Sequence, residues 1–178
     1  MNVTFLDTET TGLEVQRGDR IIEIGAIKVV DGVEVDRFYE RIDPQRQINE
    51  GAFCVHGISN AMLEGMPLFS EIAPRLISFI SGTELQIHNS PFDDEFLSME
   101  LKRAGYDRLE AYAPIQCTLK LAKEIHPRGG HSLDSLCDRY GIDRSHRTHH
   151  GAMLDADLLM RVYDHLIKDK NKKTEGHY

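Results

Sequence analysis

Several marks of secreted and membrane proteins are missing from this 178-residue chain. Its three cysteines, Cys54, Cys117 and Cys137, lie far apart and form no C-x-x-C pair, which indicates reduced thiols rather than a disulfide framework. The N-terminus lacks a basic region followed by a long apolar stretch, and no apolar run approaches the length of a membrane span. We therefore expect a soluble, cytoplasmic protein that makes no contact with membranes.

Glycine, proline and positive charge are also not abundant. The chain has 14 glycines and 6 prolines, and 40% of its residues are hydrophobic, so it can bury a full core in one domain. Its net charge of −8 argues against a basic surface that grips long DNA duplexes. An enzyme that holds one strand end through divalent ions is compatible with this charge. We expect such a protein to bind DNA weakly and to benefit from tethering to a partner.

The beginning of the chain has the pattern of an antiparallel meander. A short β-rich run covers residues 3–7, and residues 20–30 are rich in isoleucine and valine. Asp31-Gly32 is a strong signal for a two-residue hairpin turn, so residues 33–42 should be the return strand.

Helical patterns dominate the rest of the chain. Apolar spacing predicts short helical turns within residues 52–63 and helices over residues 69–80, 92–104, 118–125, 132–140 and 152–168. A short strand at residues 85–88 and one further strand-like run join the meander. We expect an α/β fold with a sheet of mixed direction, as a single domain over residues 1–168. Residues 169–178 should form a polar, disordered tail.

Two carboxylates near the end of the first strand are the first candidates for chemistry. Residues two apart on a strand face the same side, so Asp7 and Glu9 would emerge next to each other. Carboxylates that close repel each other and raise a pKa unless a cation lies between them, and such oxygen ligands favour Mg²⁺ or Mn²⁺. The alternative is that Glu9 lies beyond the strand and both side chains are solvated.

A second acidic position follows the strand at residues 85–88. The segment His88-Asn89-Ser90-Pro91-Phe92-Asp93 leads into a helix, and an acidic side chain there would meet Asp7 if the two strands are neighbours. Periodicity does not choose between Asp93 and Asp94. Either residue could simply favour the positive end of the helix.

His150 and Asp155 form the third candidate group. Five positions on a helix correspond to an offset of about 140°, so the two would not share one helix face. The spacing suits a histidine on the loop before the helix that reaches a metal held by the aspartate. One alternative is a surface histidine in a loop that also contains His146 and His149. Another is a zinc site that adds Cys137, although no standard zinc spacing is present.

In combination these segments resemble the DEDDh exonucleases of the DnaQ-like group, most closely the proofreading subunits of bacterial DNA polymerase III. The resemblance covers nearly the whole chain. Its motifs are Leu6-Asp7-Thr8-Glu9-Thr10-Thr11-Gly12-Leu13, Ile21-Ile22-Glu23-Ile24-Gly25-Ala26, Val55-His56-Gly57-Ile58, His88-Asn89 with Phe92-Asp93, His131-Ser132-Leu133-Asp134, and His150-Gly151-Ala152 with Asp155-Ala156.

The resemblance implies a ribonuclease H-like fold with a mixed five-stranded sheet flanked by helices. It also implies that Asp7, Glu9, Asp93 and Asp155 hold two divalent ions, Mg²⁺ or Mn²⁺, and that His150 takes the proton from the attacking water. By the same likeness, the residues around the terminal nucleotide and its base are Thr10, Thr11, Gly12, Leu13, Val55, His56 and Phe92.

The reaction implied is hydrolysis at single-stranded or frayed DNA 3′ ends, which releases nucleoside 5′-monophosphates, with the polymerase III catalytic subunit as a partner. The alternatives are a stand-alone repair exonuclease, an exoribonuclease of the same fold and a non-catalytic nucleic-acid-binding module. The last would be expected to lack a carboxylate, and all four are present. The chain departs from its relatives at Gly51, where a glutamate is frequent, and at Asn49, where a proline is frequent.

Overall fold

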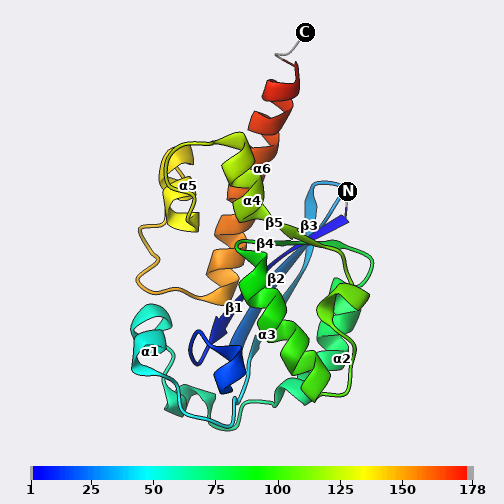
Figure 1. The fold of residues 1–178 in the computed structure, drawn as a ribbon, viewed down its shortest axis with the longest axis vertical. Coiled ribbons are helices and arrows are strands. Elements are labelled where there is room, and N and C mark those ends of the chain that lie inside the picture. The colour runs from blue at the N-terminus through cyan, green and yellow to red at the C-terminus, as the bar shows by residue number, and fades with distance from the viewer. Residues whose placement is uncertain (1, 176–178) are drawn as a thin grey trace.

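The computed structural model describes residues 2–175, which form one five-stranded sheet with helices on both faces (Figure 1). The strand order is β3-β2-β1-β4-β5. The strands are β1 (Asn2–Thr10), β2 (Ile21–Val30), β3 (Val33–Arg41), β4 (Glu84–Ile87) and β5 (Ile115–Cys117). Because β1 pairs antiparallel with β2 and parallel with β4, the prediction of a mixed sheet is confirmed.

The hairpin between β2 and β3 has the geometry that its sequence predicts. Asp31 and Gly32 have φ angles of 50° and 81°, the left-handed values that a type I′ turn requires. β1 is longer than the sequence suggested, because it continues to Thr10 and includes Glu9, which pairs with Glu23 of β2. The alternative that Glu9 lies beyond the strand is therefore excluded.

Helices cover the two faces of the sheet. On one face, α2 (Phe69–Ile80) and α3 (Ser90–Arg103) bury a core that includes Leu6, Ile24, Leu85, Leu76 and Phe96. On the other, α6 (Ala152–Glu175) packs against β1 and β2 through Val3, Phe5, Ile27, Ala156 and Leu159. Side chains alternate along a strand, so Asp7 and Glu9 emerge on the same face as Phe5, toward α6.

The shorter helices complete the fold. They are η1 (Val15–Arg17), α1 (Glu50–His56), η2 (Asn60–Leu63), η3 (Leu109–Ala111), α4 (Thr118–Ile125) and α5 (Leu133–Tyr140). The hydroxyl of Ser132 caps α5 by accepting the N–H of Ser135 at 3.1 Å, and Gly141 ends the helix with a φ of 64°. Serine is a preferred residue at the start of a helix and glycine just after its end, so both caps follow from the residue types.

The end of α6 corrects the prediction of a disordered tail from residue 169. The helix continues to Glu175, while residues 176–178 lie outside the described part of the chain. Asp169 accepts the hydroxyl of Tyr140 at 3.1 Å, and Lys173 donates to the carbonyl of Ile125. These contacts hold the polar end of α6 against α4 and α5. The polar composition of this segment does not by itself indicate them. Among residues 2–175, no helix is both long and apolar enough to cross a membrane.

Candidate active site

A glycine on β2 lets α6 approach the sheet closely. Gly25 is the partner of Asp7 across the β1–β2 ladder, and a Cβ added to it would lie 2.3 Å from backbone atoms of Ala152 and Met153. Any larger residue would push the start of α6 away from β1. On the same strand, the carboxylate of Glu23 accepts the N–H of Ala152 at 2.9 Å and so satisfies the first turn of the helix.

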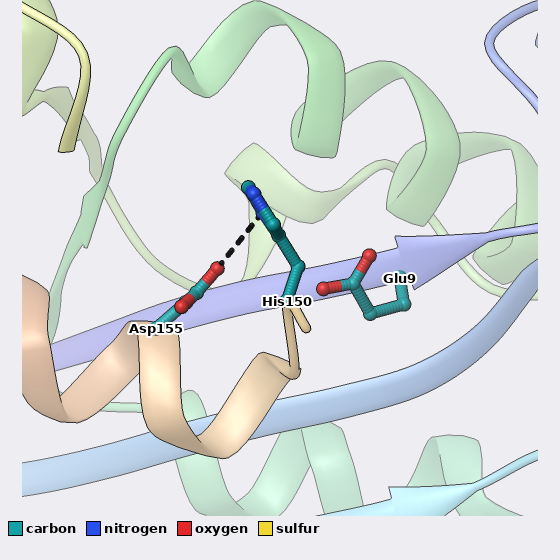
Figure 2. Close-up of side chains that lie close together, drawn as sticks. All are labelled: Glu9, His150 and Asp155. Carbon is teal, nitrogen blue, oxygen red and sulfur yellow. Dashed lines mark ion pairs between the residues drawn. The ribbon is translucent and has the colours of Figure 1, made fainter. Parts of the chain in front are cut away.

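This close packing brings three ligand-type side chains together. Figure 2 shows Glu9 on the strand, His150 on the loop before α6 and Asp155 on the helix itself. One ligand atom from each of the three lies within 4.8 Å of the others. The backbone N–H of His150 donates to the carbonyl of Val55 at 3.1 Å, which ties this loop to α1. The histidine therefore lies on the loop, and the aspartate on the helix, as the spacing predicted.

Asp93 reaches the cluster from the other side of the sheet. It lies in the first turn of α3, just after β4, and β4 is the parallel neighbour of β1. The hydroxyl of Thr8 donates to its carboxylate at 2.7 Å, and the residue is 4% exposed. Asp94 instead accepts the hydroxyl of Ser98 and lies 3.9 Å from Arg108. Of the two candidates that periodicity left open, Asp93 is the one that approaches Asp7.

The clustered carboxyls strongly affect one another. Burial, and then repulsion from Asp93, Asp155 and Glu9, raises the pKa of Asp7 well above its usual range. Burial, with repulsion chiefly from Asp155, raises the pKa of Glu9 to about 8, and burial raises that of Asp93 to about 7. For Asp155, burial acts in the same direction, but hydrogen bonds with His150 and Arg147 outweigh it and lower the pKa. The positive charge of Arg147 is therefore not sufficient to balance the negative charge of all four carboxylates in the cluster.

These donors fit divalent cations. Oxygen ligands from β1, α3 and α6 converge in a buried, negatively charged place, which is the environment that hard divalent ions prefer. Within residues 2–175, the only group of three or more histidine, cysteine or acidic side chains in ligating range is Glu9, His150 and Asp155. Cys137 packs instead in an apolar cluster with Leu136, so the alternative zinc site is not formed.

A cavity of about 500 Å³ adjoins the carboxylates. It is lined by Thr8, Glu9, Thr10, Gly12, Leu13, Glu14, Asp19, Asn49, Gly51, Ala52, Val55, His56 and Phe92. Leu13, 81% exposed, and Val55 give it an apolar rim, and the ring of Phe92 packs on Phe96 with 4.8 Å between centroids. All the residues predicted to contact the terminal nucleotide line this cavity, with the exception of Thr11.

Thr11 does not line the cavity, because its side chain is fully buried. Its hydroxyl donates to Asp19 at 2.9 Å and accepts the N–H of Arg20 at 3.0 Å. Asp19 also accepts the N–H of Glu14 at 3.0 Å, and a Cβ added to Gly12 would lie 2.3 Å from its carboxylate. Thr11 and Asp19 therefore support the loop that lines the cavity. Asp19 was not identified from the sequence.

His56 fixes a turn and lines the cavity as well. Its Nδ1 accepts the N–H of Ile58 at 3.0 Å, so Nε2 carries the proton and donates to the carbonyl of Thr10 at 3.2 Å. Burial lowers the pKa of this ring, which favours the neutral form. One side chain therefore both fixes a turn and forms part of the cavity wall.

Two charged residues at the site were not recognised from the sequence. The strand pattern suggests that Glu23 is only a polar face, whereas its buried carboxylate accepts hydrogen bonds from Ala152, Tyr39 and Arg41. A charge inside the apolar run of β2 was the available signal. Arg147 forms hydrogen bonds with Asp155, and nothing in the local sequence distinguishes it from the other polar residues of its loop.

Comparisons with known proteins identify the class. The sequence profile of the family described as "Exonuclease" matches residues 4–163. A solved structure of exonuclease X in complex with 5′ overhanging duplex DNA superimposes with a TM-score of 0.70 at 26% sequence identity, covering 91% of each chain. The chain therefore belongs to the exonuclease family, and its fold is ribonuclease H-like as the motifs predicted.

Curated relatives of similar sequence belong to a narrower group within this family. The chain is 46% identical over 167 residues to the DNA polymerase III subunit epsilon of Rickettsia conorii, covering 92% of this chain and 72% of that one. It is 43% identical over 164 residues to the DNA polymerase III subunit epsilon of Pasteurella multocida, covering 89% of this chain and 65% of that one. The chain thus spans roughly two thirds of the length of these relatives, which support the predicted 3′-to-5′ exonuclease class.

Proposed function

We propose that the chain removes nucleotides one at a time from single-stranded or frayed DNA 3′ ends, as the proofreading exonuclease of a DNA polymerase III. The observation that carries this proposal is the convergence of four carboxylates and His150 beside a cavity of about 500 Å³. A cavity of this size accommodates one small ligand such as a nucleotide. Glu9 lines this cavity, so the phosphodiester bond of a nucleotide bound there would lie beside the carboxylates.

Asp7, Glu9, Asp93 and Asp155 would hold two divalent ions, Mg²⁺ or Mn²⁺. When bound, such ions make water a nucleophile at neutral pH and balance the charge on the leaving oxygen. The four ligands come from a strand and two helices that the core holds in place, which favours a fixed spacing between them. The hydroxyl of Thr8 orients Asp93 in the way that outer hydrogen bonds orient metal ligands.

His150 would take the proton from the attacking water. Its side chain is 47% exposed while its backbone is bonded to Val55, so the ring can turn toward a water near Asp155 without movement of the loop. Proton transfer by a positioned side chain contributes roughly 10²–10⁴-fold to a rate. The resulting product is a nucleoside 5′-monophosphate.

The cavity would receive the terminal nucleotide. Leu13, Val55 and Phe92 offer apolar surface to its base. Every base has an apolar face, so contacts of this kind do not select a particular sequence. An exonuclease that must remove any terminal nucleotide needs this tolerance.

A polymerase partner would deliver the DNA end. The relatives at 43% and 46% identity are subunits of DNA polymerase III. With a net charge of −8, the chain itself has little electrostatic attraction for DNA phosphates. Association with the catalytic subunit would raise the local concentration of 3′ ends.

The neighbours Asp93 and Asp94 provide a matched test. The full chain is incubated with 5′-labelled single-stranded DNA in Mg²⁺, Mn²⁺ or EDTA, and we expect stepwise shortening from the 3′ end in either metal and none in EDTA. Asp93→Asn should lower the rate roughly 100-fold or more. Asp94→Asn removes the same charge one position away and should stay within about threefold of wild type.

Wild-type rates in Asp93→Asn, or digestion that begins at the 5′ end, would overturn the proposal. An RNA oligomer of the same sequence is run in parallel, because faster digestion of RNA would favour the exoribonuclease alternative. A pull-down with the polymerase III catalytic subunit tests the partner separately. Failure to bind it would remove the proofreading role but leave the exonuclease.

A further inference from the structure

Arg147 lies inside the carboxylate cluster, in the loop between α5 and α6. Its side chain is 5% exposed. Its Nε and Nη2 donate to the two carboxylate oxygens of Asp155 at 2.6 and 2.7 Å. Its Nη1 donates to Asp134 at 2.5 Å, and Nη2 lies 2.9 Å from Nδ1 of His150. Both oxygens of a proposed metal ligand are thus occupied by a cation of the chain itself.

This pairing is strong and well oriented. A planar guanidinium that donates to both oxygens of a carboxylate is among the most favourable ion-pair geometries, and burial strengthens it. The same charge opposes the rise in the pKa of Asp7 and Glu9. Arg147 is therefore placed to act as a counter-ion for the whole cluster.

We propose that Arg147 holds Asp155 and His150 until a divalent ion displaces it, so that the guanidinium competes with the metal. The inference rests on the proposed metal site. Each oxygen of Asp155 accepts a hydrogen bond from Arg147, so a bond to a metal must replace at least one of them. The affinity measured for the ion is then lower than that of the carboxylates alone, because part of the binding energy is used to move the guanidinium.

The same displacement would release the general base. Nδ1 of His150 lies 2.9 Å from Nη2 of Arg147 and 3.3 Å from a carboxylate oxygen of Asp155. An arginine side chain only donates hydrogen bonds, so Nδ1 accepts from Arg147 when it carries no proton and donates to Asp155 when it carries one. A ring nitrogen that accepts this bond has no free lone pair with which to take a proton from water. Withdrawal of Arg147 therefore completes the metal ligand and frees the histidine in one movement.

Asp134 gives the displaced guanidinium a place to go. Its carboxylate is 40% exposed and already accepts from Nη1 of Arg147. Arg147 can therefore leave Asp155 without becoming an unpaired charge, which limits the cost of the exchange. Arg144 also lies beside this carboxylate, with 3.6 Å between its Nη1 and an oxygen of Asp134.

A Mn²⁺ titration of the full chain, read by the electron paramagnetic resonance of free Mn²⁺, distinguishes competition from support. Arg147→Gln removes the charge, and we expect the Kd for Mn²⁺ to fall roughly tenfold. The melting temperature in EDTA should fall as well, since the carboxylates lose their counter-ion. Arg144→Gln is the matched control, because it removes the same charge from the same loop. The Arg144 side chain pairs with Asp138 and Asp134 and is not bonded to Asp155. Its Kd should stay within about twofold of wild type.

Unchanged or weaker Mn²⁺ binding by Arg147→Gln would overturn the inference, because removal of a residue that merely supports the site does not tighten binding. If that variant does not fold, Arg147→Lys keeps the charge but not the two-pronged contact, and a lower Kd is again required. Wild-type protein that binds no Mn²⁺ would overturn the proposed metal site together with the inference. Wild-type binding with an unresponsive Arg147 variant would overturn the inference alone.

Discussion

His150 combines an exposed imidazole with a backbone held by a hydrogen bond. The side chain can therefore contact water while the backbone keeps the residue in a fixed position. We predict that His150→Ala lowers turnover roughly 10²–10⁴-fold, the range for loss of a general base. Its melting temperature should change little because the side chain is not part of the core. Steady-state hydrolysis of labelled single-stranded DNA and a thermal melt measure the two quantities.

His146→Ala is the control for this change, since it removes an exposed histidine from the same loop. We expect its turnover to match that of wild type. Equal losses in the two variants would show that the loop, and not the imidazole of His150, determines the rate. Full activity in His150→Ala would exclude its role as the base.

Single residues also mark how far sequence reasoning reaches. Asp7 and Glu9 were predictable because strand alternation places them on one face, whereas periodicity alone left Asp93 and Asp94 equivalent. The charge of Glu23 inside an apolar run was a signal, but neither its partners nor those of Arg147 were predictable. The fold determines which residues they contact. Glu23 accepts the N–H of Ala152, 129 positions away, and no local sequence pattern indicates such a pair.

At the scale of elements, the contact between β2 and α6 determines whether the carboxylates meet. Gly25→Ala would place a Cβ 2.3 Å from backbone atoms of Ala152 and Met153, and backbone cannot rotate aside as a side chain does. We predict that the start of α6 shifts, that Asp155 moves away from Glu9, and that stability falls by about 1–3 kcal/mol or more. Chemical denaturation and Mn²⁺ titration measure the two effects.

Gly51→Ala is the comparison for this prediction. Gly51 lies in α1, and a Cβ there meets nothing within 4 Å, so the change should leave stability unchanged or raise it by up to about 1 kcal/mol through helix propensity. The two changes should therefore differ: Gly25→Ala lowers the stability, and Gly51→Ala does not. A Gly25→Ala protein as stable as wild type, with Mn²⁺ binding intact, would refute the role given to this contact.

The elements themselves were largely predictable where a repeating pattern faces one core. α2 and α4 have the bounds that apolar spacing predicted, and the hairpin turn lies at Asp31-Gly32. The prediction was wrong at the end of α6, because there the helix is held by polar contacts such as that of Asp169 with Tyr140 and not by an apolar stripe. Helix ends stabilised by long-range polar pairs are not visible in periodicity.

At the scale of the whole molecule, the buried carboxyls of the site make the folded state less stable as pH rises. The pKa of Glu9 in the folded chain is about 8, against an ordinary value of 4.5, and that of Asp93 is about 7, against 3.8. Between each pair of values the folded state retains a proton that the unfolded state has released. The free energy of unfolding in EDTA should therefore decrease as pH rises through this window, by at most about 1.4 kcal/mol per pH unit for each group.

The stability that these two groups contribute is fully present below their ordinary pKa values and is lost as pH approaches 8. Urea denaturation between pH 5 and 8.5 in EDTA measures the slope, and Glu9→Gln isolates one group because its amide does not titrate. We expect a shallower fall in this variant and higher stability than wild type at pH 8.5. Mn²⁺ should reverse the fall in wild type, since a ligand that binds only the folded state stabilises it and replaces the bound protons. Identical slopes in wild type and Glu9→Gln would mean that the pKa of Glu9 is not raised in the folded chain, and would contradict the loss of stability ascribed to it.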